Sequence, residues 1–212
     1  MFDFILSLDR ELLLAINNWH SAFFDNFMFN YSKTWVWAFF YVSMIFVFVK
    51  TYGKQSIWMI IALILCVTVA DKIASGVLKE TVCRLRPSQN PDLDGLIHLV
   101  NGYRSGLYGF ASSHAANSFA LAALSALFLR NKFFVCLVTI WAVINCYSRM
   151  YLGVHYPLDI LAGAFIGTII SFLIYFIYKK IFKNFEPKEI SNCIVLIPFG
   201  VWVLSVLMMM IM

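Results

Sequence analysis

Charged side chains are scarce in this sequence. Only 13% of its 212 residues are charged, whereas 62% are hydrophobic, and the mean hydropathy is +0.81. A soluble domain of this length cannot bury that much apolar surface, so the composition excludes an ordinary soluble protein. The charges gather between long apolar runs, which is typical of a membrane protein whose spans are helices. We therefore expect one all-α, polytopic integral-membrane domain over residues 1–212.

The sequence also lacks the ligand clusters of a metal site or a redox centre. Its five cysteines show no CxxC spacing, and four of them lie in or at the ends of apolar runs, where small buried side chains are common. No cluster of carboxylates accompanies the four histidines. We therefore expect neither a metal nor another cofactor.

A nucleic-acid partner is not expected, although the net charge is +5 and the pI is near 9.0. The cations flank the apolar runs and form no basic face with interleaved aromatic residues. Arg10 is the only cation among the first residues, so we expect no cleavable signal peptide. The expected partner is the lipid bilayer, and no protein partner is inferred.

Six apolar segments are predicted to form membrane-spanning helices. They are residues 34–49, 57–79, 112–129, 133–147, 156–178 and 190–212. Residues 2–18, within an interfacial region spanning 1–30, have an apolar face and predict a helix lying in the membrane surface. The long polar connection 84–111 is expected to be functional and to contain a short helix at 93–100. Gly163 and Gly167 predict a close approach of a neighbouring helix.

The distribution of cations predicts the orientation. With six spans, eight Lys and Arg residues lie in the loops on one side and seven on the other, three of which belong to the motifs described below. Setting those three aside leaves four against eight, so the positive-inside rule places the lysine-rich side in the cytoplasm. The motifs would then face outward, and we expect a bacterial inner-membrane protein with its site on the periplasmic side.

Polar residues interrupt the apolar sequence at 148–159. Pro157 suits the first turn of a helix, which places Asp159 in that turn and four residues after His155. The carboxylate is favoured there by the helix dipole and can accept a hydrogen bond from one ring nitrogen of His155. The other nitrogen would be free to attack an electrophile. A polar helix start at the membrane surface explains this stretch alone equally well.

Two further polar segments are expected on the same membrane face. Lys79 and Arg86 would share one face of a continued helix, with roughly 10 Å of rise between them. Ser112-Ser113-His114 opens a helix, where free backbone N–H groups attract phosphate. Arg149 offers a planar fork for two phosphate oxygens. Cations, a helix N-terminus and two histidines together indicate phosphoryl transfer with a histidine nucleophile and a histidine acid.

These segments, taken together and in this order, resemble the three signature motifs of the type 2 phosphatidic acid phosphatase family. The motifs read Lys79-x6-Arg86-Pro87, Ser112-Ser113-His114 and Ser148-Arg149-x5-His155-x3-Asp159. Members of that family are integral-membrane lipid phosphatases that share a helical-bundle fold with vanadium haloperoxidases. This chain departs from the usual Pro-Ser-Gly-His of the middle motif, because it has Ala111 and Ser113 at the first and third positions. Glycine adopts backbone conformations that other residues avoid, so Ser113 restricts the conformations open to this loop.

The resemblance implies a role for each motif residue. His155 would attack phosphorus and form a phosphohistidine, while Asp159 fixes its tautomer. His114 would protonate the leaving oxygen and then activate water. The phosphate oxygens would be held by Lys79, Arg86, Arg149, the Ser112 hydroxyl and the Ser113 amide.

Other functional classes remain open from the sequence. A transporter would carry ionisable residues near the bilayer midplane, whereas here they collect at one face. A lipid phosphotransferase would use the same covalent intermediate with an alcohol acceptor, and a haloperoxidase is disfavoured because those proteins are soluble. The substrate is also open among undecaprenyl diphosphate, phosphatidylglycerol phosphate, phosphatidic acid and the phosphates of lipid A.

Overall fold

The computed structural model describes residues 2–211, and most of them are helical. The helices are α1 (Phe2–Asn17), α2 (Ala22–Tyr31), α3 (Ala38–Tyr52), α4 (Ser56–Asp71), α5 (Lys79–Val82), α6 (Ser113–Phe128), α7 (Lys132–Tyr151), α8 (Pro157–Ile181) and α9 (Asn192–Ile211). A π-helical stretch, Lys72–Leu78, joins α4 to α5. The two-residue strands β1 (Leu129–Arg130) and β2 (Lys188–Glu189) pair in parallel.

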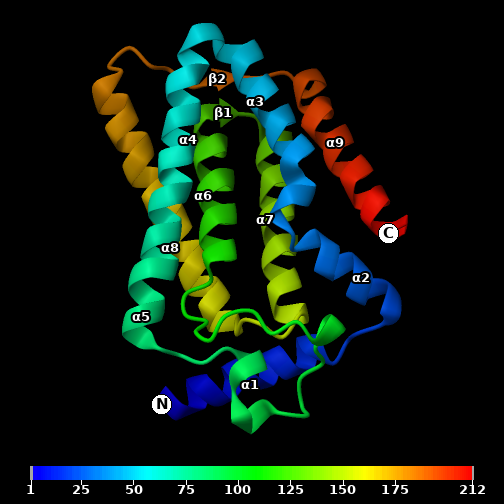
Figure 1. The fold of residues 1–212 in the computed structure, drawn as a ribbon. Coiled ribbons are helices and arrows are strands. Elements are labelled where there is room, and N and C mark those ends of the chain that lie inside the picture. The colour runs from blue at the N-terminus through cyan, green and yellow to red at the C-terminus, as the bar shows by residue number, and fades with distance from the viewer. Residues whose placement is uncertain (1, 212) are drawn as a thin grey trace.

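Helix α6 lies in the middle of the bundle, packed against α4, α7 and α8 (Figure 1). Its buried face consists mainly of alanine and serine, which lets the surrounding helices come close. A large apolar core, rich in aromatic side chains, fills the space between α3, α4, α6, α7 and α9. The all-α bundle predicted from the sequence is confirmed.

The two glycines of α8 explain its close packing against α6. A Cβ atom on Gly163 would collide with the carbonyl oxygen of Ser112, and one on Gly167 would collide with that of Ala116. Both obstacles are backbone atoms, which cannot swing away as a flexible side chain does. The close approach predicted from this glycine pair is therefore confirmed, and it holds the start of α6 against α8.

The outer surface of the bundle is apolar. Large hydrophobic side chains on α3, α4, α8 and α9 are exposed, including Phe39, Ile64, Phe165, Phe176 and Leu204. Four helical stretches within residues 2–211 are long and apolar enough to cross a membrane, and the first, Thr34–Val82, bends at Gly53 into α3 and α4. These features are those of an integral membrane protein. The number of spans stays a prediction, because α6 has only 16 residues.

Several predicted boundaries were wrong. Helix α7 continues to Tyr151 rather than ending at 147, since no breaker precedes Gly153, so Arg149 lies on the helix. Residues 93–100 contain turns instead of a short helix, with Gly95 at a φ of 76°. Helix α2 was not predicted; its N-cap, Ser21, accepts a hydrogen bond from the Phe24 N–H at 3.4 Å. The predicted end of the last helix, Met212, lies outside the described residues.

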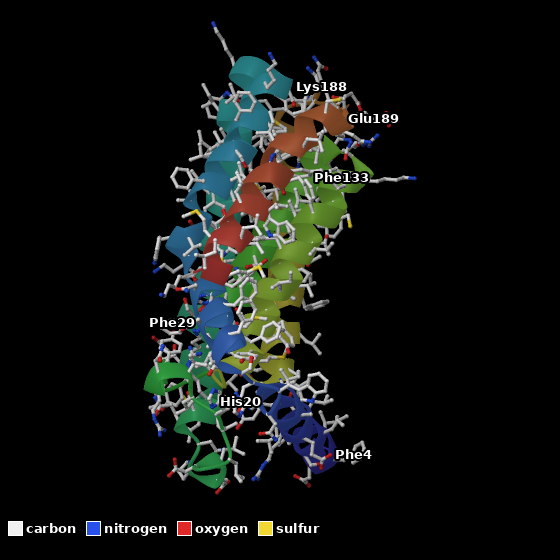
Figure 2. The ribbon with its side chains drawn as sticks, turned by 90° about the vertical axis from the view of Figure 1, so that its right-hand side faces the viewer. Phe4, His20, Phe29, Phe133, Lys188 and Glu189 are labelled. Carbon is white, nitrogen blue, oxygen red and sulfur yellow. The ribbon has the colours of Figure 1, made fainter. Side chains whose placement is uncertain are left out.

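All three motifs lie at one end of the bundle, where α5 ends, α6 begins, α7 ends and α8 begins (Figure 1). Helix α1 and the connection between α5 and α6 lie across that end. Figure 2 shows Phe4 and His20 at this end and Lys188 and Glu189 at the opposite one. The fold thus brings residues from three separated motifs to one site beside α1.

Candidate active site

The turn between α7 and α8 places His155. Gly153 adopts a φ of 66°, a left-handed conformation that a glycine takes without strain, and the Val154 N–H donates to the Arg149 carbonyl at 3.1 Å. The chain then reverses, and α8 begins at Pro157, as the sequence predicts. His155 is held in this short turn with only 1% of its surface exposed.

The two ring nitrogens of His155 face different partners. Nδ1 lies 3.4 Å from Asp159 Oδ2, and Nε2 lies 2.7 Å from Arg86 Nη1. A guanidinium can only donate, so Nε2 carries the lone pair and the proton belongs on Nδ1, facing the carboxylate. The Nδ1 distance is long for a hydrogen bond, but catalytic hydrogen bonds commonly tighten when substrate binds. This arrangement leaves the lone pair of Nε2 available to an electrophile.

Burial lowers the pKa of His155 well below its ordinary value, and the charges of Arg86, Arg149 and Lys79 lower it further. The ring is therefore neutral at physiological pH, with its attacking lone pair free of a proton. A bound phosphate would neutralise part of the surrounding positive charge. The same cations that keep the His155 ring unprotonated can thus bind an anionic phosphate group.

Asp159 is fixed by contacts on both of its oxygens. Oδ2 accepts from the Tyr156 N–H at 2.9 Å, which caps the start of α8, and Oδ1 accepts from Arg84 Nη1 at 3.0 Å. Gly109 lies directly above this carboxylate, because a Cβ there would come within 2.9 Å of Oδ2. The carboxylate is fully buried, so its orientation toward His155 is set by the fold.

Arg86 and Arg149 are buried cations without a counter-ion. They are 5% and 2% exposed, and within residues 2–211 the ion pairs of arginine involve Arg84 and Arg104 instead. The Nε atoms of Arg86 and Arg149 are buried and unpaired. Burial, with a smaller effect of Arg149, lowers the pKa of Arg86 to about 10, so Arg86 remains charged at neutral pH. A buried cation without a partner is costly, which indicates an anionic ligand.

The middle motif forms the start of α6. Ser112 is its N-cap: the hydroxyl accepts from the Ala115 N–H at 3.4 Å, and the Ser112 N–H donates to the Asp159 carbonyl at 2.9 Å. Ser113 is partly exposed and its hydroxyl lies 3.3 Å from Lys79 Nζ. His114 lies near enough to Arg149 and His155 for electrostatic interactions with both side chains. The eight motif residues expected at the site are thus brought to one region.

One geometric prediction for this region was wrong. Lys79 and Arg86 do not share a helix face, because α5 ends at Val82 and Cys83 adopts a left-handed φ of 50°. Arg86 follows in an extended segment, where its Nη1 also donates to the Val154 carbonyl at 3.0 Å. The two cations nevertheless lie close enough for their charges to interact.

Two site residues were missed by the sequence interpretation. Arg84 contacts Asp159, and Asp9 of α1 lies 2.6 Å from Arg84. Arg84 lies only two residues before Arg86 but outside the motif spacing. The one signal for Asp9 is that Asp9, Leu13 and Asn17 share a face of α1, at spacings of four residues.

The assembled groups suit phosphoryl transfer. A neutral buried histidine, a second histidine and three cations lie together near the start of α6. Within residues 2–211 no group of three or more His, Cys, Asp or Glu side chains is placed to hold a metal ion. Among the described residues, Lys79, Arg86, Arg149 and the N-terminus of α6 supply positive charge at this site.

Comparisons with known proteins agree with this chemistry. A family model described as the PAP2 superfamily matches residues 57–183. A lipid A 4′-phosphatase of Bacteroides thetaiotaomicron is 40% identical over 85% of this chain and 81% of the relative, and one of Porphyromonas gingivalis is 35% identical over 83% and 75%. The crystal structure of a transmembrane PAP2-type phosphatidylglycerolphosphate phosphatase from Bacillus subtilis covers 86% of this chain and 89% of its own, with a TM-score of 0.64 and 22% identity. The resemblance drawn from the three motifs is confirmed, and this integral membrane protein belongs to the PAP2 superfamily.

Proposed function

We propose that this protein removes a phosphate from a lipid A-type glycolipid through a phosphohistidine at His155. The chain is a phosphoric ester hydrolase acting on a membrane lipid, as its relatives are, and neither the phosphotransferase nor the transporter alternative is favoured. The observation that carries the proposal is a pair of buried arginines, Arg86 and Arg149, which have no carboxylate partner within residues 2–211 and lie beside a buried neutral histidine. The relatives' substrate supports the choice of lipid.

An apolar cavity supports a lipid substrate. It has a volume of about 400 Å³ and lies between α3, α4, α6 and α7, with His114 in its lining. Ile45 of α3 and Ile64 of α4 also line it, and both have exposed side chains on the outer surface of the bundle. A chain of the lipid can therefore extend from the bilayer, between α3 and α4, toward His114 while the headgroup reaches the arginines.

Polar residues that line the cavity favour a lipid whose headgroup region carries hydrogen-bonding groups. Trp141 Nε1, Asn117 Oδ1 and Asn145 Oδ1 belong to lining residues and are buried without partners. Buried polar groups are normally satisfied, so these atoms indicate a ligand that supplies donors and acceptors. The acylated amino sugars of lipid A carry amide and hydroxyl groups, whereas a polyprenyl chain carries none.

In the first half of the reaction, Nε2 of His155 attacks phosphorus as the bond to the lipid oxygen breaks. Arg86 exchanges its contact with Nε2 for a phosphate oxygen, and Arg149 and Lys79 hold the remaining charge. Asp159 accepts a hydrogen bond from the Nδ1–H group and stabilises the positive ring. His114 gives a proton to the leaving oxygen, so the lipid departs as an alcohol.

In the second half, water replaces the lipid. His114, now without its proton, accepts one from the water as the oxygen attacks phosphorus and the bond to Nε2 breaks. Inorganic phosphate leaves, and both histidines regain their starting protonation states. The same three cations contact the phosphate in both halves of the reaction.

The substrate assignment predicts a rank order among lipids. Purified protein in detergent should release phosphate from bis-phosphorylated lipid A with a kcat/KM about tenfold or more above phosphatidic acid, phosphatidylglycerol phosphate and undecaprenyl diphosphate, because one or two additional hydrogen bonds are worth roughly that much. The His155→Ala variant, assayed in parallel, corrects for contaminating phosphatases. A higher kcat/KM for any of the other three lipids would refute lipid A as the preferred substrate.

We also propose that the site faces the periplasm of the bacterial inner membrane. The end opposite the motifs carries Lys188 and the basic linker after α8, as Figure 2 shows for Lys188. With the exposed cysteines Cys83, Cys136 and Cys193 replaced by serine, Asp94→Cys should react with an impermeant maleimide in intact spheroplasts and Lys183→Cys should react only after lysis. The reverse labelling pattern would refute this orientation.

A further inference from the structure

Helix α1 presents two different faces. Phe4, Leu8 and Leu12 are exposed, as expected for a helix that rests in the membrane surface. Asp9 and Asn17, by contrast, are buried against the rest of the protein, although each is polar. Charged residues are rarely buried without a specific partner, so the inward face of α1 requires an explanation beyond membrane attachment.

Asp9 is joined to the catalytic carboxylate through one guanidinium. Arg84 donates from Nη2 to Asp9 Oδ2 at 2.6 Å and from Nη1 to Asp159 Oδ1 at 3.0 Å. The same guanidinium lies over the Tyr156 ring, 3.9 Å from its centre. The second oxygen of Asp9 accepts from the Leu158 N–H, in the first turn of α8, at 2.8 Å. Arg84 is thus held by two carboxylates and an aromatic ring directly behind the catalytic pair.

We propose that Asp9 and Arg84 are positioning residues for catalysis, which keep Asp159 oriented toward His155 and keep a net negative charge behind it. This inference rests on the roles proposed above for His155 and Asp159. Arg84 fixes Oδ1 of Asp159 and leaves Oδ2 to face the ring. Asp9 balances the charge of Arg84, so that Arg84 does not cancel the charge of Asp159.

The charge balance explains why two carboxylates are needed. Arg84 alone with Asp159 would form a neutral pair, which could not stabilise a positively charged phosphohistidine in a buried site. With Asp9 added, the three groups together carry a net negative charge. Burial raises the pKa of Asp9, and the hydrogen bonds from Arg84 and the Leu158 N–H oppose that rise by favouring the carboxylate. On the opposite side of the ring, the phosphate is held by cations that Asp9 does not touch.

The test is a double-mutant cycle on Asp9 and Arg84 in the full-length protein, measured as kcat, KM and inhibition by inorganic phosphate. Asp9→Asn and Arg84→Gln should each lower kcat about tenfold to a hundredfold, a range typical of residues that orient a functional side chain through a hydrogen bond. The KM and the inhibition constant should change by about twofold or less, because Lys79, Arg86 and Arg149 still hold the phosphate. Arg84→Gln leaves two buried carboxylates without their cation, which should make it the slower single variant.

The double variant separates a charge role from a structural one. Asp9→Asn combined with Arg84→Gln restores a single negative charge at Asp159, so its kcat should exceed that of Arg84→Gln alone. If the two residues only held α1 in place, both single variants and the double variant would lose kcat equally, because each of them breaks the same contact. Asp9→Glu and Arg84→Lys keep the charges and should recover most of kcat. These two variants also test the proposal if Asp9→Asn does not fold.

Two variants control for the docking of α1. The Asn17 side chain donates to the carbonyls of His98 and Tyr151 at 3.0 and 2.7 Å, and Arg10 donates to the Asp92 carbonyl at 3.0 Å, so both tie α1 to the rest of the protein without touching Asp159. Asn17→Ala and Arg10→Gln should keep kcat within about threefold. Equal losses in Asn17→Ala and Asp9→Asn, or equal losses in all three variants of the cycle, would overturn the proposal. Activity of the unsubstituted protein on the same lipid tests the proposed function separately.

Discussion

Replacing His155 with alanine is expected to abolish phosphate release from the lipid and from an activated ester such as nitrophenyl phosphate alike. The substitution removes Nε2, the lone pair that the structure places beside Arg86 at 2.7 Å, and no better leaving group can compensate for a missing nucleophile. The expected loss in kcat is about 10⁵-fold or more, the scale seen when an enzyme loses its covalent nucleophile. Phosphate release by purified variants on both substrates measures it.

His98→Ala is the matched control for that variant. His98 lies at the same end of the bundle, but its Nε2 is 2.9 Å from Asp25 and its ring stacks on His20 at 3.7 Å, away from the phosphate contacts. Its loss should leave kcat within about threefold of the unsubstituted protein. If His98→Ala lost as much activity as His155→Ala, or if His155→Ala kept activity on the activated ester, the nucleophile would be elsewhere.

Replacing His114 with alanine is expected to lower the rate in a way that depends on the leaving group. Lipid hydrolysis should fall about 10²- to 10⁴-fold, because the departing alkoxide is a strong base and needs a proton in the transition state. Nitrophenolate leaves without that proton, so nitrophenyl phosphate should recover a large part of the lost rate. The measurement compares kcat for both substrates in His114→Ala and in the unsubstituted protein.

The recovery in His114→Ala has a limit that can itself be observed. His114 is also the proposed base for the water attack, so the second half of the reaction should become rate-limiting and an initial burst of nitrophenol should appear. Equal losses on the lipid and on nitrophenyl phosphate, with no burst, would show that His114 is not the acid.

The motif spacing predicted most of the geometry of the candidate site, because short-range contacts at the ends of helices determine where these side chains lie. Pro157 starts α8, and this places Asp159 in the first turn, where its Oδ2 both caps the helix and faces His155. Ser112 likewise caps α6, as its position before an apolar run predicts. These contacts span only a few residues, so one sequence contains the information needed to predict them.

The errors arose where backbone breaks or long-range pairs decide the structure. Cys83 ends α5 in a left-handed conformation that a cysteine does not predict. This turn separates Arg86 from the helix that carries Lys79. The Asp9 and Arg84 pair joins residues 75 positions apart, and neither hydrophobic periodicity nor a motif indicates which partner a polar residue on α1 would find. Such contacts depend on how α1 packs against the loop after α5.

Trapping the covalent intermediate tests the central claim most directly. The protein is mixed with ³²P-labelled lipid for a few milliseconds and quenched in alkali, in which a phosphohistidine survives, and the labelled peptide is then identified by mass spectrometry. We predict an acid-labile, alkali-stable label on His155 that accumulates in His114→Ala and is absent from His155→Ala. Label on another residue, or persistence of the phosphoenzyme in His155→Ala, would contradict the account.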